Sequence, residues 1–118
     1  MAEYTPIKKA ANWFIGEKKT FQYTIRNADG SLANISSWDL QWTLRPAAES
    51  DTVFILKTSQ AGGINKSDPA NGVCLVLIDP DDYGEVTGAG TFDKALKRTD
   101  GDNDQTLAFG EAVLQASA

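Results

Sequence analysis

Alternation of apolar and polar side chains is the feature that most constrains how this chain folds. The segment WDLQWTLR, residues 38–45, changes character at every position, and TFQYTIR, residues 20–26, repeats the pattern. A period of two predicts β-strands that bury one face and expose the other. The inward set of the first segment is expected to be Trp38, Leu40, Trp42 and Leu44, and its outward set Asp39, Gln41, Thr43 and Arg45.

The rest of the chain also favours strands over helices. No ten-residue segment carries a helical stripe, and turn residues recur at the spacing of about 8 to 12 residues typical of a β-sandwich. Pro80, with Asp79 as its cap, predicts one helical turn. The fold class is therefore all-β. Further strands are expected at residues 12–15, 53–58, 72–79, 91–98 and 106–114, and residues 61–72 are expected to form a loop with at most one short strand.

The length of 118 residues gives room for one hydrophobic core. We expect an N-terminal arm at residues 1–11, followed at residues 12–118 by a single sandwich of about seven to eight antiparallel strands. Asp29 and Gly30 supply a tight turn after one of these strands.

The charge and hydropathy of the chain exclude several classes of partner. Eleven basic residues against sixteen acidic ones give a net charge of −5 at pH 7, so a nucleic-acid backbone would be repelled. No run approaches the roughly 20 apolar residues of a membrane helix, and the N-terminus lacks the apolar core of a signal peptide. We expect a soluble protein that is made in the cytoplasm and binds neither nucleic acid nor membrane.

Residues suited to catalysis are scarce. The chain contains no histidine, which is the commonest side chain for proton transfer near neutral pH. Its acidic residues gather in polar turns rather than beside apolar segments that would raise a pKa. Cys74 is the single cysteine, and its position in the run VCLVLI predicts a buried, inert thiol. We therefore expect no catalytic residue, no cofactor and no enzymatic activity.

Two long segments carry a resemblance to a known family. The first has a Gly-acidic start, an alternating strand, an Asp-Gly turn and an aromatic strand that ends in Leu-Arg; the second has an acidic crossover, a strand that ends in Arg-Thr-Asp, and a last strand with Phe-Gly. This order resembles small immunoglobulin-like domains of tailed bacteriophages, found at the N-terminus of baseplate upper proteins and in stand-alone decoration proteins. The matching residues are Gly16, Glu17, Asp29, Gly30, Leu44, Arg45, Arg98, Thr99, Asp100, Phe109 and Gly110.

The resemblance covers roughly residues 12 to 115 and implies an immunoglobulin-like β-sandwich in a structural protein of the virion. A capsid decoration (cement) protein is the favoured role, because a small acidic domain suits attachment to a preformed lattice. Baseplate proteins of this kind continue into a long further segment, whereas this chain ends at Ala118. A tail or baseplate component is the alternative. The implied partners are phage capsid or tail proteins, and self-association into an oligomer is left open.

One segment raises the question of calcium. In DGDNDQTLAFGE, residues 100–111, Asp100, Asp102 and Asp104 alternate as at the start of a calcium loop. Gln105 stands where an EF-hand needs glycine, and strands rather than helices are expected on either side. The three carboxylates form a weak candidate site, and a solvated turn that closes a hairpin is the favoured interpretation.

The aromatic residues allow two interpretations. Trp38 and Trp42 share a face with leucines, which favours core packing over a platform that stacks on sugars. Trp13 and Phe14 are adjacent, so on a strand at least one of them is exposed or covered by another chain. Tyr4, Ile7, Trp13 and Phe14 form the candidate protein interface. A carbohydrate-binding module is the alternative function from another class.

Overall fold

The computed structural model describes residues 7–47, 50–100 and 105–116. Within these ranges the chain forms nine strands and two short 3₁₀ helices. The elements in chain order are β1 (Ile7–Lys8), β2 (Ala11–Phe14), β3 (Lys19–Thr24), β4 (Leu40–Arg45), β5 (Ile55–Thr58), β6 (Ile64–Asp68), η1 (Pro69–Asn71), β7 (Val73–Ile78), η2 (Pro80–Tyr83), β8 (Gly90–Arg98) and β9 (Gln105–Gln115).

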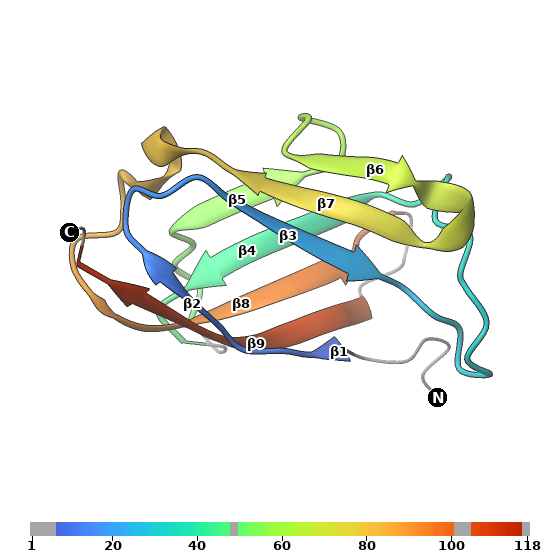
Figure 1. Cartoon of the computed structure of the whole chain (residues 1–118), viewed down its shortest axis with the longest axis horizontal. Coiled ribbons are helices and arrows are strands. Elements are labelled where there is room, and N and C mark those ends of the chain that lie inside the picture. The colour runs from blue at the N-terminus through green and yellow to red at the C-terminus, as the bar shows by residue number, and fades with distance from the viewer. Residues whose placement is uncertain (1–6, 48–49, 101–104, 117–118) are drawn as a thin grey trace.

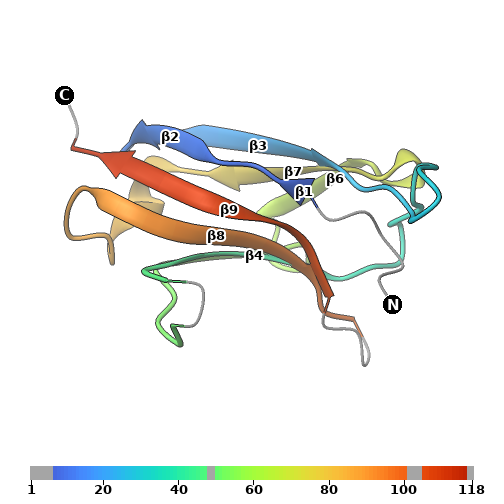
Figure 2. The same cartoon turned by 90° about the horizontal axis from the view of Figure 1, so that it is seen from below.

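The strands form two sheets that pack face to face (Figures 1 and 2). The larger sheet has the order β1-β9-β8-β4-β5, with β2 also paired to β9, and the smaller sheet has the order β3-β7-β6. The orders β9-β8-β4-β5 and β3-β7-β6 correspond to G-F-C-C′ and B-E-D of an immunoglobulin-like sandwich. The predicted fold class is confirmed.

The first two strands depart from the expected antiparallel arrangement. β1 and β2 run parallel to β9, with Ile7 beside Ala108 and Trp13 beside Leu114. They cover the edge of β9, and the chain then turns to enter β3 in the other sheet. Residues 7, 8 and 11 of the expected N-terminal arm therefore belong to the sandwich.

The core between the sheets contains the residues that the alternation pointed inward. Trp42 is fully buried, and the ring of Phe21 stacks on it with 5.7 Å between centroids. The indole nitrogen of Trp42 donates to the hydroxyl of Tyr23 at 3.2 Å. Trp38 is also buried, as is Cys74, and burial raises the pKa of the Cys74 thiol to about 11. An inert thiol is consistent with that shift.

Thr43 corrects one detail of the prediction. It was expected to face solvent, yet only 3% of it is exposed. Its side chain does point away from the core, but β4 lies between β8 and β5, and Ala95 and Leu56 stand directly opposite Thr43. Neighbours on both sides cover a small side chain on a central strand. Alternation thus predicts the direction of a side chain and not its burial.

The turns follow the sequence closely. Gly30 has a φ of 90°, and the amide of Asn27 donates to the carbonyl of Ser31 at 2.8 Å, which closes the predicted turn. The predicted helical turn is η2, where the carboxylate of Asp82 accepts a hydrogen bond from the amide of Asp79 at 2.7 Å. Neither helical turn in the described part of the chain has the length or apolarity to cross a membrane.

Candidate functional site

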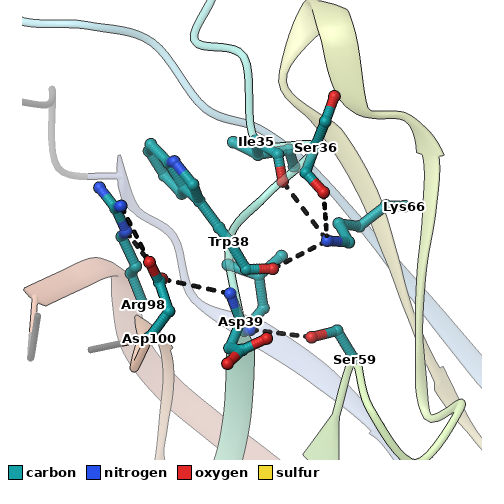
Figure 3. Close-up of polar contacts among 9 residues, drawn as sticks. Ile35, Ser36, Trp38, Asp39, Ser59, Lys66, Arg98 and Asp100 are labelled. Atoms are coloured by element: carbon teal, nitrogen blue, oxygen red, sulfur yellow. Dashed lines mark hydrogen bonds and ion pairs between the residues drawn. The ribbon is translucent and has the colours of Figure 1, made fainter.

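Asp100 is the residue of the candidate calcium site that the structure describes, and its carboxylate is bound by other groups of the protein. Its carboxylate accepts hydrogen bonds from Arg98 at 2.8 Å and 3.0 Å and from the amide of Asp39 at 3.2 Å (Figure 3). The bonds from Arg98 lower the pKa of Asp100 to about 2. Asp102 and Asp104 lie outside the described residues. Asp100 therefore fastens the start of β4 to the end of β8.

Lys66, on β6 of the smaller sheet, holds the segment that precedes β4. Its ammonium group donates to the carbonyls of Trp38 at 2.8 Å and Ser36 at 3.0 Å (Figure 3). The guanidinium of Arg98 lies 4.2 Å from the ring centroid of Trp38. These contacts hold the segment that carries the chain from one sheet to the other. The cluster has a structural role, because its charged groups bind other groups of the same chain.

A second acidic cluster lies on η2. Carboxylate oxygens of Asp79, Asp81 and Asp82 come within 4.8 Å of one another. Asp82 is already held by the amide of Asp79 and by Lys57, whose ammonium lies 2.6 Å away. The cluster caps and anchors the helical turn.

The candidate interface of the sequence analysis divides in the structure. Trp13 is a core residue, only 2% exposed, and its indole nitrogen donates to the hydroxyl of Tyr83 at 2.8 Å. This corrects its assignment to a contact surface, because the inward face of β2 packs against the sandwich. Ile7 is partly buried against the core. Tyr4 lies outside the described residues.

Among the described members of this set, Phe14 is the exposed one, with 38% of it exposed. It borders an open depression of about 810 Å³ between the β2–β3 turn and η2, together with Ile15, Pro80 and Tyr83. The predicted opposition of Trp13 and Phe14 across β2 is confirmed. The depression is wide and shallow, so it offers little enclosure to a small ligand.

A more continuous surface lies on the outer face of the larger sheet. Phe109 on β9 pairs with Ala95 on β8, Ala95 pairs with Thr43 on β4, and Thr43 pairs with Leu56 on β5. These four residues, Phe109, Ala95, Thr43 and Leu56, form a cross-strand line that we call the outer row. Phe109 and Leu56 are the exposed large side chains at its ends, and strand spacing puts them about 14 Å apart.

Polar residues flank the outer row on both sides. The short side chains of Ala95 and Thr43 leave a hollow of about 240 Å³ in the middle of the row, with Phe109 at one wall. Charged side chains of Arg45, Asp93 and Lys97 line its rim. Two exposed apolar side chains on either side of a hollow with a charged rim have the composition of a small protein interface. The outer row lacks the paired carboxylates or activated nucleophile of an enzyme site.

Sequence reasoning did not find the outer row. Leu56 follows Ile55 directly, so one of the pair had to face outward, and this was the available signal. Phe109 was named only as part of the Phe-Gly motif of the last strand. The alignment of Leu56 with Phe109 depends on the register of four strands, and the pairing of β8 with β9 contains a bulge. The register between strands cannot be predicted from the sequence of one strand alone.

No family model matches the chain, and no curated protein matches it. Among solved structures, it is similar to the NK cell receptor Nkp44, described as a triggering partner in natural cytotoxicity. The identity is 14%, the TM-score is 0.47, and the alignment covers 92% of this chain and 97% of the receptor chain.

Proposed function

We propose that this chain is a non-enzymatic structural protein of a tailed-phage particle, and that the outer row binds the assembled capsid in many copies as a decoration protein. The observation that supports protein binding is the outer row. The order of turns and strands described above, which resembles phage immunoglobulin-like domains, supports the virion assignment.

The size of the outer row suits a repeated lattice. Two exposed apolar side chains about 14 Å apart bury too little area for tight binding by one isolated copy. On a shell that presents the same surface many times, weak contacts suffice when neighbouring copies or two-point attachment add avidity. The charged rim around the hollow would fix the orientation of each copy rather than supply most of the affinity.

The aromatic side chains favour this proposal over a glycan-binding module. A sugar-stacking platform needs exposed aromatic faces in a groove, yet Trp13, Trp38 and Trp42 are all buried. Phe14 and Phe109 are the exposed phenylalanines of the described chain, and they lie far apart. Phe14 borders the open depression and pairs with Gln115, six residues along β9 from Phe109, which lies on the outer row. They do not combine into one stacking surface.

The proposal is tested by cosedimentation of the purified protein with empty capsids and, separately, with tails of the parent particle. We expect saturable binding to capsids at a fixed ratio per shell subunit. Binding to tails alone would move the protein to the tail or baseplate and overturn the decoration role. Binding to neither particle, with retention on a host-glycan array, would replace the structural role with glycan recognition.

A further inference from the structure

β3 forms an open edge of the smaller sheet. Among the described strands it pairs with β7 alone, in a register that places Tyr23 opposite Cys74. The amide of Ile25 donates to the carbonyl of Gly72 at 2.9 Å, just before β7. In an antiparallel pair, every second residue directs its backbone amide and carbonyl toward the partner strand, so Tyr23 and Phe21 also face β7. The backbone groups of the residues between them point away from the sheet. These edge residues are Thr20, Gln22 and Thr24.

A groove runs beside this edge, where β2 and β3 lie next to each other on one side of the sandwich (Figure 2). Its volume is about 310 Å³. β2 bonds to β9 rather than to β3, so the groove separates the two sheets and is not closed by a backbone ladder. The lining residues are Lys9, Ala10, Ala11, Asn12, Lys19, Thr20, Phe21, Gln22, Tyr23 and Lys94.

The charge of this groove is opposite to that of the whole chain. Three of the lining residues are lysines and none is acidic, although the chain carries a net charge of −5. The ammonium groups of Lys19 and Lys94 each lie 5.7 Å from the ring centroid of Phe21. The ion pairs found in the described part of the chain, Lys57–Asp82 and Arg98–Asp100, include none of the groove lysines.

Lys94 is the most unusual of the three lysines. It points inward from β8, only 2% of it is exposed, and its ammonium group donates to the backbone carbonyl of Lys9. Burial disfavours the charged form and lowers the pKa of Lys94, and nearby Lys9 adds to this effect. A buried cation that is bonded to a neutral carbonyl gains strongly when a carboxylate reaches it. The groove therefore offers a place for an acidic side chain.

We propose that this groove binds an extended acidic segment of another polypeptide, which adds a strand beside β3 and places a carboxylate near Lys94. Backbone hydrogen bonds to Thr20, Gln22 and Thr24 would supply the affinity, as in other cases of strand addition. The lysines would select acidic residues at alternate positions, because alternate side chains of the added strand face the same side. This site lies apart from the outer row and does not depend on the capsid assignment.

The experiment titrates the ¹⁵N-labelled protein with a peptide of about seven residues, which is within the usual range of strand lengths, that alternates glutamate with valine and threonine. A peptide with glutamine in place of glutamate is the matched probe. We expect the amides of Thr20, Gln22 and Thr24 to shift and to become protected from hydrogen exchange. The glutamate peptide should bind at least about tenfold more tightly than the glutamine peptide, the usual gain from a charge-assisted contact.

Two variants separate the backbone and charge contributions. Gln22→Pro removes an outward amide that β7 does not use, and is expected to abolish binding, whereas Gln22→Val keeps that amide and should bind normally. Lys94→Met should remove the preference for glutamate. Equal binding of the two peptides, peptide-induced shifts confined to the outer row, or undiminished binding by a folded Gln22→Pro variant would each overturn the proposal.

Discussion

Phe109 and Leu56 stand at opposite ends of one cross-strand line on the outer face of the larger sheet, joined by Ala95 and Thr43. They come from β9 and β5, which lie on either side of β8 and β4 in the sheet. Two exposed apolar residues separated by more than 50 positions in the sequence thus lie on one face of the sheet, about 14 Å apart. The fold builds this surface from strand register, and the proposed role in binding a protein lattice depends on it.

Substitution of Gly110 is expected to displace the N-terminal strands. A Cβ at this position would lie 2.1 Å from the carbonyl oxygen of Lys9, between β1 and β2. Gly110→Ala should therefore lower the free energy of unfolding by about 1 to 3 kcal/mol, as overpacking usually does. Gly88→Ala is the matched control, because a Cβ there meets nothing within 4 Å. Equal urea midpoints for the two variants would contradict this account of the strand crossing.

Replacement of Lys94 by methionine is expected to stabilise the free protein. Desolvation lowers the pKa of Lys94 below 10.5, so the folded state releases a proton more readily than the unfolded state. The charged side chain then costs stability in full below its folded pKa, and the cost disappears as pH rises toward 10.5. Lys94→Met should be more stable than the native protein at neutral pH and lose this advantage in alkaline buffer.

Urea denaturation at several pH values measures this difference. Lys18→Met, which changes an exposed lysine, should match the native protein throughout. A loss of stability in Lys94→Met at neutral pH would mean that the bond from Lys94 to the carbonyl of Lys9 outweighs the cost of burial.

Alkaline pH is expected to destabilise the protein through two buried acids. Burial raises the pKa of Tyr23 from 10.0 to about 12 and that of Cys74 from 9.0 to about 11. The folded state keeps both protons where the unfolded state releases them, so this stabilisation is complete below pH 9 and is lost as pH rises through 12. Each group accounts for about 2 to 3 kcal/mol.

Thermal melts between neutral and alkaline pH report this loss. The variant Cys74→Ala should show a shallower decline, beginning near the ordinary pKa of tyrosine rather than that of cysteine. A native protein whose melting temperature stays constant through this range would contradict the assigned burial of the two groups.

Calcium is expected to leave stability unchanged. Arg98 already occupies both carboxylate oxygens of Asp100, which is the described residue of the candidate loop. Millimolar Ca²⁺ covers the affinity range of weak extracellular calcium sites. The melting temperature in millimolar CaCl₂ should therefore equal that in EDTA. A rise in CaCl₂ that Asp100→Asn abolishes would reinstate the calcium site.

Much of the fold follows from short-range patterns. The alternation in residues 38–45 predicted which side chains of β4 face the core, and Asp29–Gly30 predicted the turn after β3. Both signals are local, because the side-chain period of a strand and the positive φ of glycine depend on neighbouring residues only.

The candidate sites depend on longer-range relationships. The parallel pairing of β2 with β9 joins residues about 100 positions apart, and it decides that Trp13 is buried and that the β3 edge is open. The burial of Thr43 depends on its neighbours from β5 and β8. Lys94 occupies an inward position of β8 that is usually apolar. Hydrophobic periodicity would assign a lysine at this position to the surface.

The proposed capsid-binding role of the outer row is tested most directly by cosedimentation of a variant that carries Leu56→Glu and Phe109→Glu. Leu32→Glu is the matched control, because Leu32 is a similarly exposed apolar residue away from the row, beside the Asp29–Gly30 turn. We predict that the double variant stays folded and binds empty capsids at least about tenfold more weakly, while the control binds as the native protein does. Undiminished capsid binding by the folded double variant would contradict the account.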